Sequence, residues 1–125
     1  HFGGRVGFDE LPCYYRTADI YLSASLTDGS SVSLMEALAC GKPAILSDIP
    51  GNQEWIDQST GWFFPVGDWE ALSDTILQAY QQREKVRSTM RLNARVLAEQ
   101  RADWQKNFAK LLDAYQLAME IQHGI

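Results

Sequence analysis

Short apolar runs separated by turn-forming residues occupy the first half of the chain. Runs at 19–24, 43–47 and 61–65 are brief, apolar and bounded by glycine, proline or aspartate, which predicts three buried strands. Between them the pattern predicts helices over 9–17, 31–40 and 53–57. Buried strands that alternate with helices pair in parallel, so we expect an α/β fold with a Rossmann-like parallel sheet. We also expect the chain to begin at the end of a strand, at Phe2.

The spacing of apolar residues changes after Asp68, which is predicted to cap a helix. Trp69, Leu72, Ile76 and Tyr80 then recur at helical spacing, and a second helix is predicted over 84–100. A third helix begins near Asp103 and carries an apolar stripe made of Trp104, Phe108, Leu111, Leu112, Tyr115 and Met119. We expect this stripe to pack into a core, so C-terminal helices complete the fold.

The composition is that of one ordinary globular domain. Hydrophobic residues make up 46% of the 125 positions and charged residues 22%, which excludes a disordered chain. The net charge of −5 disfavours a nucleic-acid partner, because that binding needs a basic surface. No apolar run approaches the roughly 20 residues that span a bilayer, and no secretory signal is recognised. Cys13 and Cys40 are expected to be inert buried thiols in a cytoplasmic protein.

Charge is unevenly distributed along the chain. Residues 1–79 hold three basic and eleven acidic residues (net −8), whereas residues 80–125 hold eight basic and five acidic residues (net +3). Four arginines, Arg83, Arg87, Arg91 and Arg95, recur at every fourth position of the second predicted C-terminal helix. A solvated helix face is the favoured interpretation. An anionic membrane or an acidic neighbour is the alternative.

The stretch from Ser25 to Glu36 carries the clearest chemical signal. It begins where a predicted parallel strand ends and closes inside a helix, which is where open α/β sheets bind ligands. The first amides of that helix, near Ser31 to Ser33, suit a phosphate or diphosphate. Asp28 and Glu36 flank them and can accept hydrogen bonds from sugar hydroxyls, which predicts a nucleotide sugar. Alternatively, Asp28 is a turn residue and Glu36 an ordinary surface residue.

The same stretch resembles the signature of a known family. Residues 28–43, DGSSVSLMEALACGKP, are similar to the acid-x7-Glu signature of the family 4 retaining glycosyltransferases, which have the GT-B fold. Two further motifs follow in the family's order, SDIPGNQE at 47–54 and TGWFFPVGD at 60–68. Upstream, FGGRV and a Leu…Tyr-x-x-Ala-Asp pattern ending at Asp19 also match, as do Trp104 and Tyr115. The resemblance covers essentially the whole chain.

The resemblance implies a role for each acid. Glu36 matches the acid that binds the ribose hydroxyls of the donor nucleotide. Asp28 matches the acid that contacts the transferred sugar near the reacting centre, and is therefore the candidate catalytic residue. The family usually has Glu at that position and more often has Gly where Ser31 stands, so this chain departs from the pattern twice.

The resemblance also implies where the rest of the donor lies. The backbone that receives the diphosphate corresponds to Gly29, Ser30, Ser31 and Val32. Arg5 and Val6 lie in the loop that in the family lies beside the base. Reactions of this kind retain anomeric configuration and usually need no metal, so no metal or other cofactor is expected. The two histidines sit at the termini, at His1 and His123, and form no cluster with the cysteines.

The resemblance further implies that the chain is part of a longer enzyme. Residues 1–101 match the later part of the donor-binding domain, and residues 102–125 match a helix that reaches toward the N-terminal domain. Exposure of part of this last helix is therefore the alternative to its packing in the core. The family places an Arg and a Lys that neutralise the diphosphate upstream, so the fragment alone is expected to be inactive. The intact enzyme is expected to bind a nucleotide sugar and an acceptor glycan or glycolipid, and peripheral membrane association is a further expectation.

Two other functions stay open at this point. A non-catalytic module that only recognises a nucleotide or nucleotide sugar is favoured by the departures at Asp28 and Ser31. A protein-interaction domain is favoured by the aromatic residues of the C-terminal helices.

Overall fold

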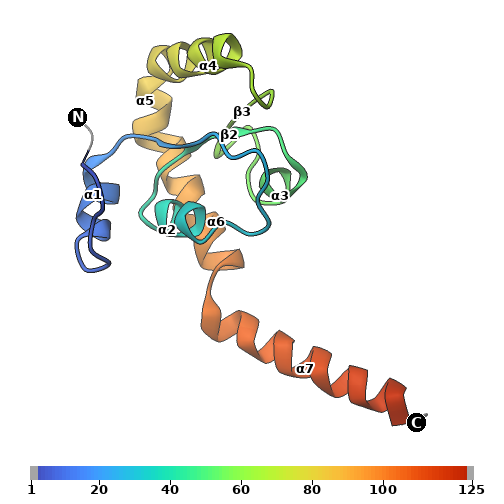
Figure 1. The fold of residues 1–125 in the computed structure, drawn as a ribbon. Helices are drawn as coiled ribbons and strands as arrows, with labels where there is room; N and C mark the ends of the chain where they lie inside the picture. The colour runs from blue at the N-terminus through green and yellow to red at the C-terminus, as the bar shows by residue number, and fades with distance from the viewer. Residues whose placement is uncertain (1–2, 124–125) are drawn as a thin grey trace.

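A three-stranded parallel sheet forms the centre of the molecule in the computed structural model, which describes residues 3–123. The strands β1 (Tyr21–Ser23), β2 (Ala44–Ser47) and β3 (Gly61–Phe64) lie in the order β1-β2-β3 (Figure 1). Tyr21 pairs with Ala44, which pairs with Gly61 on its other side. The predicted α/β fold with a Rossmann-like parallel sheet is confirmed. The strand expected at Phe2 lies outside the described residues.

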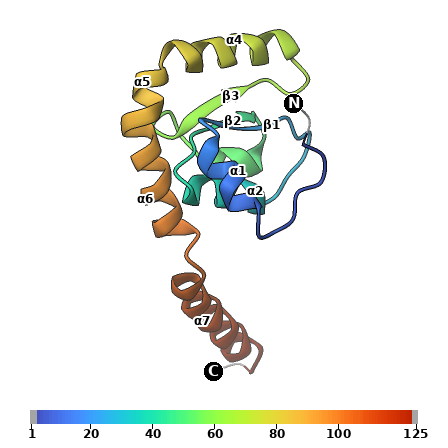
Figure 2. The same ribbon diagram turned by 90° about the vertical axis from the view of Figure 1, so that its left-hand side faces the viewer.

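Helices cover both faces of the sheet. Figure 2 shows α4 (Trp69–Gln81) above the sheet, and α1 (Leu11–Thr17) and α2 (Val32–Ala39) below it. Alternate residues of β2 point to opposite faces. Ile45 therefore packs with Phe64 and Ala79 on the α4 side. On the other side lies the main core, made of Leu34, Leu38, Ala44, Leu46, Ile56, Ala94 and Ala98.

The edge of the sheet differs from its centre. All four residues of β2 are buried, because strands pair with it on both sides and helices cover both faces. The strand predicted over 19–24 is confirmed at Tyr21–Ser23, but its expected burial was wrong, since Leu22 is 44% exposed. Among the described residues only β2 pairs with β1, which leaves its outer edge uncovered.

The predicted helix over 84–100 is confirmed as one helical run with a local widening. It consists of α5 (Arg83–Lys85), a π-helical turn η1 (Val86–Met90) and α6 (Arg91–Arg101). Small side chains on α6 let this helix pack closely against α2. As a result, Ala94 and Ala98 of α6 are buried in the main core. Two arginines of the stripe that was expected to be solvated also form ion pairs. Arg87 pairs with Asp19 at 3.4 Å, and Arg95 pairs with Glu99 at 2.6 Å.

Small residues also decide which face of α4 is buried. Asp68 caps this helix as predicted, its carboxylate accepting from the amide of Ala71 at 2.9 Å. Of the residues that defined the helical period, Leu72 packs against the cluster of Ile45, Phe64 and Ala79. Trp69 is 74% exposed and Tyr80 65% exposed. Thr75 and Ala79 are buried instead.

Two short helices begin elsewhere than expected. Helix α1 is capped at Glu10 rather than Asp9, and the Glu10 carboxylate accepts from the amide of Gly7. Helix α3 (Pro50–Gln53) replaces the helix predicted over 53–57, because Pro50 suits the first turn of a helix. Cys13 is exposed and Cys40 is half-buried, so the expectation that both thiols are buried was wrong.

The last helix, α7 (Trp104–His123), extends away from the rest of the molecule (Figures 1 and 2). Its apolar stripe, from Trp104 to Met119, is exposed, so the expectation of core packing was wrong within the described residues. Neither view places another element alongside this helix. Within residues 3–123, no helix has both the length and the apolar character needed to cross a membrane.

Candidate functional site

The N-terminus of α2 opens at the carboxyl edge of the sheet, directly after β1 and its loop. Ser31 caps the helix, and its hydroxyl accepts from the amide of Leu34 at 3.4 Å. Ser33 hydrogen-bonds to the Ser31 hydroxyl at 3.1 Å and to the phenol of Tyr21 on β1 at 2.7 Å. The amides of Val32 and Ser33 have no intrahelical acceptor, since they lie in the first turn. They carry the positive end of the helix dipole.

The loop between β1 and α2 is held by contacts with β2 and α3. The hydroxyl of Ser47, the last residue of β2, donates to the carbonyl of Ser25. Gly51 in α3 lies directly against the carbonyl oxygens of Asp28 and Gly29, so close that a β-carbon there would overlap both. The buried side chain of Asn52 donates to the Ser47 carbonyl at 2.8 Å and anchors α3 to the sheet. The backbone of the predicted diphosphate loop is therefore held in place by β2 and α3.

The side chains of this loop face solvent. Asp28, Gly29 and Ser30 are exposed, and Val32 is 68% exposed at the start of α2. The Asp28 carboxylate has no hydrogen-bond partner among residues 3–123, whereas its backbone packs on α3. The side chain is thus available to a ligand while its backbone is held.

Glu36 lies one turn further into α2 and is half-buried. The hydroxyl of Tyr15 on α1 donates to Glu36 Oε2 at 3.2 Å. Burial, followed by this hydrogen bond, raises the pKa of Tyr15 to about 12. Two hollows meet at Glu36. One of about 440 Å³ runs along α2 toward the end of α6, and one of about 310 Å³ lies between α1 and α2.

Arg5 and Val6 lie in a different segment from Asp28 and Glu36. Both are in the loop before α1, with Arg5 exposed and Val6 half-buried. No hydrogen bond or ion pair within the described range joins Arg5 to Asp28 or Glu36. The structure thus brings Asp28 and the helix start together on one loop, and Glu36 with α1. Phe8 of the loop before α1 lines the hollow at Glu36, whereas Arg5 and Val6 do not line it.

Tyr15 and Gly51 were missed by reasoning from the sequence, although a signal for each was present. Tyr15 is the tyrosine of the Tyr-x-x-Ala-Asp pattern, and Gly51 is the glycine of the SDIPGNQE motif. The contacts of Tyr15 with Glu36 and of Gly51 with Asp28 could not be inferred from residue type, because they join elements that are distant along the chain.

Arg95 lines both hollows at Glu36, and Arg16 lines the one between α1 and α2. Lys42 is buried, and its ammonium donates to the carbonyl of Arg16 at 3.0 Å. Burial, reinforced by the charge of Arg91, lowers the pKa of Lys42. Across residues 3–123, no group of three or more His, Cys, Asp or Glu side chains is placed to hold a metal ion. The amides at the start of α2 are the groups best placed to meet an anion.

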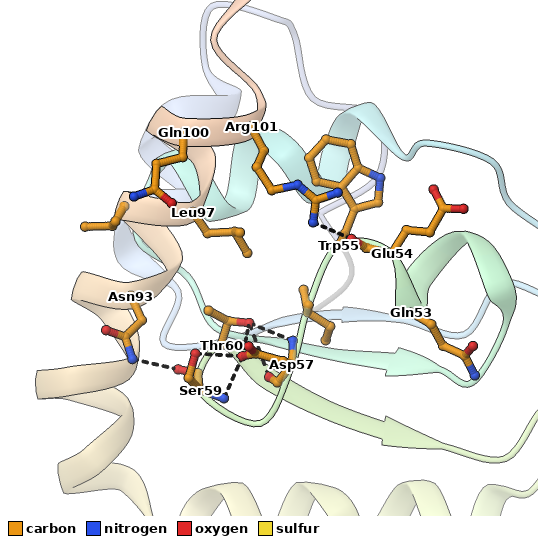
Figure 3. A pocket seen from close by; sticks show the side chains of 12 residues that line it. Gln53, Glu54, Trp55, Asp57, Ser59, Thr60, Asn93, Leu97, Gln100 and Arg101 are labelled. Atoms are coloured by element: carbon orange, nitrogen blue, oxygen red, sulfur yellow. Dashed lines mark hydrogen bonds between the residues drawn. The ribbon is translucent and has the colours of Figure 1, made fainter.

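A separate hollow of about 430 Å³ lies between α6 and the segment that precedes β3 (Figure 3). Its polar groups bind one another. The Asp57 carboxylate accepts from the Ser59 amide at 2.8 Å, and Asn93 donates to the Ser59 carbonyl at 3.2 Å. The guanidinium of Arg101 lies 4.9 Å from the ring centroid of Trp55. The hydrogen bonds from Ser59 and Thr60 lower the pKa of Asp57. These contacts connect the segment to α6.

The fold is a Rossmann-like α/β domain in which the start of α2 opens at the carboxyl edge of the sheet. The chain belongs to the family described as glycosyl transferases group 1, whose model matches residues 1–96. It is 40% identical over 86 residues to the amylovoran biosynthesis glycosyltransferase AmsK of Erwinia amylovora, covering 61% of this chain and 21% of that protein. It is 30% identical over 119 residues to D-inositol 3-phosphate glycosyltransferase of Saccharomonospora viridis, covering 94% of this chain and 27% of that protein.

Solved structures of GT-B glycosyltransferases share the fold. Sucrose-phosphate synthase from Thermosynechococcus elongatus superposes with a TM-score of 0.82 at 27% identity, covering 100% of this chain and 31% of that chain. HepE of Anabaena, solved in complex with UDP, superposes with a TM-score of 0.74 at 23% identity, covering 84% of this chain and 30% of that chain. The chain therefore spans less than a third of the length of each of these proteins.

Proposed function

We propose that this chain is the donor-binding part of a retaining glycosyltransferase of family 4. The intact enzyme transfers a sugar from a nucleotide-sugar donor to a hydroxyl of an acceptor glycan or glycolipid. Membership of the group 1 family supports the reaction class. The acid-x7-Glu signature from Asp28 to Glu36 supports the retaining subclass.

One observation carries the proposal, namely the capped start of α2 with Glu36 on the same helix. In the proposed complex the donor diphosphate lies against the unsatisfied amides of Val32 and Ser33, where backbone dipoles favour its charge. The carboxylate of Glu36 accepts hydrogen bonds from the ribose hydroxyls. Its hydrogen bond to Tyr15 leaves Oε1 for this purpose.

Asp28 is proposed to contact the transferred sugar. It is exposed in the loop whose backbone Gly51 supports, so its position is set by the backbone rather than by side-chain contacts. Gly29, Ser30 and Ser31 complete the wall that faces the diphosphate, and Arg5 with Val6 belongs to the loop proposed for the base. No metal is assigned a role, because backbone amides meet the phosphate charge in this arrangement.

The exposed stripe of α7 fits the same proposal. A stripe of large apolar residues in water favours a covering partner. We assign that role to the N-terminal, acceptor-binding part of the intact enzyme. The 125-residue chain alone is then inactive, because transfer requires acceptor and donor to be held together.

Replacing Glu36 tests the donor assignment. In the full-length protein, Glu36→Ala is expected to weaken binding of the nucleoside diphosphate about tenfold to hundredfold, since a lost hydrogen bond to a charged group costs about 1.5–3 kcal/mol. Calorimetric titration with UDP, GDP and ADP measures this, with UDP first because HepE holds it.

The matched control is Glu70→Ala, an exposed glutamate in the first turn of α4 on the opposite face of the sheet. It is expected to bind the diphosphate as the wild type does. Equal affinities of wild type and Glu36→Ala would contradict the donor assignment.

A further inference from the structure

Tyr15 approaches Glu36 from a different element. Tyr15 lies on α1 and Glu36 on α2, and their hydrogen bond spans 21 positions of the sequence. The Tyr15 ring also packs against the ring of Tyr21, with centroids 6.5 Å apart. The ring of Tyr15 is therefore packed, and its hydroxyl has Glu36 as its hydrogen-bond partner.

The position of Tyr15 is set by a buried anchor. Helix α1 has no buried residue of its own, so packing alone holds it weakly. The ammonium of Lys42 donates to the carbonyl of Arg16, the residue next to Tyr15. Because Lys42 is buried in the connection between α2 and β2, this bond fixes α1 to the core beside the tyrosine. The hydroxyl thus reaches Glu36 from a fixed backbone.

We propose that Tyr15 is a positioning residue that holds the Glu36 carboxylate in the orientation needed to receive the hydroxyls of the bound nucleotide. The inference rests on the proposed function, since it assumes that Glu36 binds those hydroxyls. By donating to Oε2, Tyr15 restrains the side-chain torsions of Glu36 and leaves Oε1 free to accept from the ligand. The restraint is in place before the ligand binds, and this preorganisation improves affinity.

The chemistry of the phenol suits this role. A pKa of about 12 keeps the Tyr15 hydroxyl protonated across the working range of an enzyme, so it serves as a donor to the carboxylate throughout. Phenylalanine keeps the ring but removes the donor. Tyr15→Phe therefore isolates the hydrogen bond from the packing against Tyr21.

The experiment compares two ligands that differ only in the ribose hydroxyls. The full-length protein is titrated with UDP, GDP and ADP, and the tightest binder is compared with its 2′,3′-dideoxy analogue. The wild type is expected to prefer the ribonucleotide, and Glu36→Ala is expected to abolish that preference. Tyr15→Phe is expected to reduce the preference about threefold to tenfold, as the loss of one hydrogen bond implies, without changing affinity for the analogue.

Tyr14→Phe is the matched control. Tyr14 is the neighbouring residue on α1, is 54% exposed and makes no side-chain hydrogen bond within the described part of the chain. The preference of this variant is expected to equal that of the wild type. A preference reduced equally in Tyr14→Phe would overturn the specific role of Tyr15.

The remaining outcomes separate the two proposals. If Glu36→Ala abolishes the preference and Tyr15→Phe keeps it, or weakens both ligands equally, the role of Tyr15 is overturned and the donor assignment stands. If no nucleotide binds, or Glu36→Ala keeps the preference, the donor assignment fails and the role of Tyr15 fails with it.

Discussion

Helices α6 and α7 follow one another in the chain and have opposite environments. On α6 the buried residues are alanines, with Ala94 fully buried and Ala98 4% exposed. On α7 the large apolar residues are exposed, with Trp104 at 68% and Tyr115 at 63%. The apolar stripe of α7 is the stronger sequence signal for burial, yet α6 is the helix that packs. Close approach to α2, permitted by small side chains, decides burial here.

Polar contacts reinforce the difference. Arg95 of α6 donates to the carbonyl of Ala39 at 2.6 Å, which satisfies the end of α2, and Arg101 donates to the carbonyl of Glu54. Helix α1 is intermediate, since it buries no residue but is held by Tyr15 and by the Lys42 anchor. The molecule therefore has a packed body around α2 and α6, one helix tied to it by hydrogen bonds, and one that projects.

The largest effect is expected from a matched pair of leucine truncations. In the 125-residue chain, Leu38→Ala removes a fully buried core side chain and is expected to lower the free energy of unfolding by about 2–5 kcal/mol. Leu112→Ala on α7, where the side chain is 53% exposed, is expected to change it by less than about 0.5 kcal/mol. Urea unfolding measures both.

Similar costs for the two variants would contradict the contrast between the body and α7. The full-length protein sharpens the comparison, because a covered α7 predicts a clear cost for Leu112→Ala there.

The next largest effect concerns the contact between α3 and the loop of Asp28. Gly51→Ala is expected to lower the free energy of unfolding by about 1–3 kcal/mol, because the added β-carbon overlaps two carbonyl oxygens. This holds although alanine is the better helix former. Gly29→Ala in the facing loop is the control, since open space surrounds its β-carbon position. Thermal unfolding that ranks Gly29→Ala as the more damaging change would show that the loop is packed differently.

Local signals in the sequence predicted most of the fold. The cap at Asp68 is read from residue type and position, and Gly41 after α2 has the left-handed φ of 69° that glycine favours there. Ser31 was expected to be the first residue of its helix and is instead its cap. The strands β2 and β3 were likewise predicted within one residue of their bounds. These features depend on neighbours in the chain, which a single sequence contains.

Features that depend on distant neighbours were not predictable in the same way. The exposure of β1, the burial of Ala79 in place of Trp69, and the uncovered stripe of α7 all follow from what packs alongside each element. In the site, the motif resemblance pointed to Asp28 and Glu36. The partner of Glu36 and the support beneath Asp28 come from α1 and α3.

The smallest effect is expected from the anchor of α1. The folded state lowers the pKa of Lys42, so the folded chain releases this proton at lower pH than the unfolded chain, whose lysine keeps it up to about 10.5. The unfolded state then binds more protons, and the free energy of unfolding rises with pH as 10.5 is approached. Lys42→Met should remove this part of the rise.

Chemical unfolding at a series of alkaline pH values measures the Lys42 effect. Lys110→Met on exposed α7 is the control and should keep the slope of the wild type. A slope unchanged by Lys42→Met would show that the Lys42 ammonium keeps its proton in the folded protein as readily as in the unfolded one.

The start of α2 and Glu36 are proposed to bind a nucleoside diphosphate. The most direct measurement is a crystal structure of the full-length protein with the diphosphate that binds it most tightly. We expect phosphate oxygens about 3 Å from the amides of Val32 and Ser33, with the ribose hydroxyls hydrogen-bonded to Glu36 and the Tyr15 hydrogen bond retained. A nucleotide bound elsewhere, or a ribose that does not contact Glu36, would contradict this proposal.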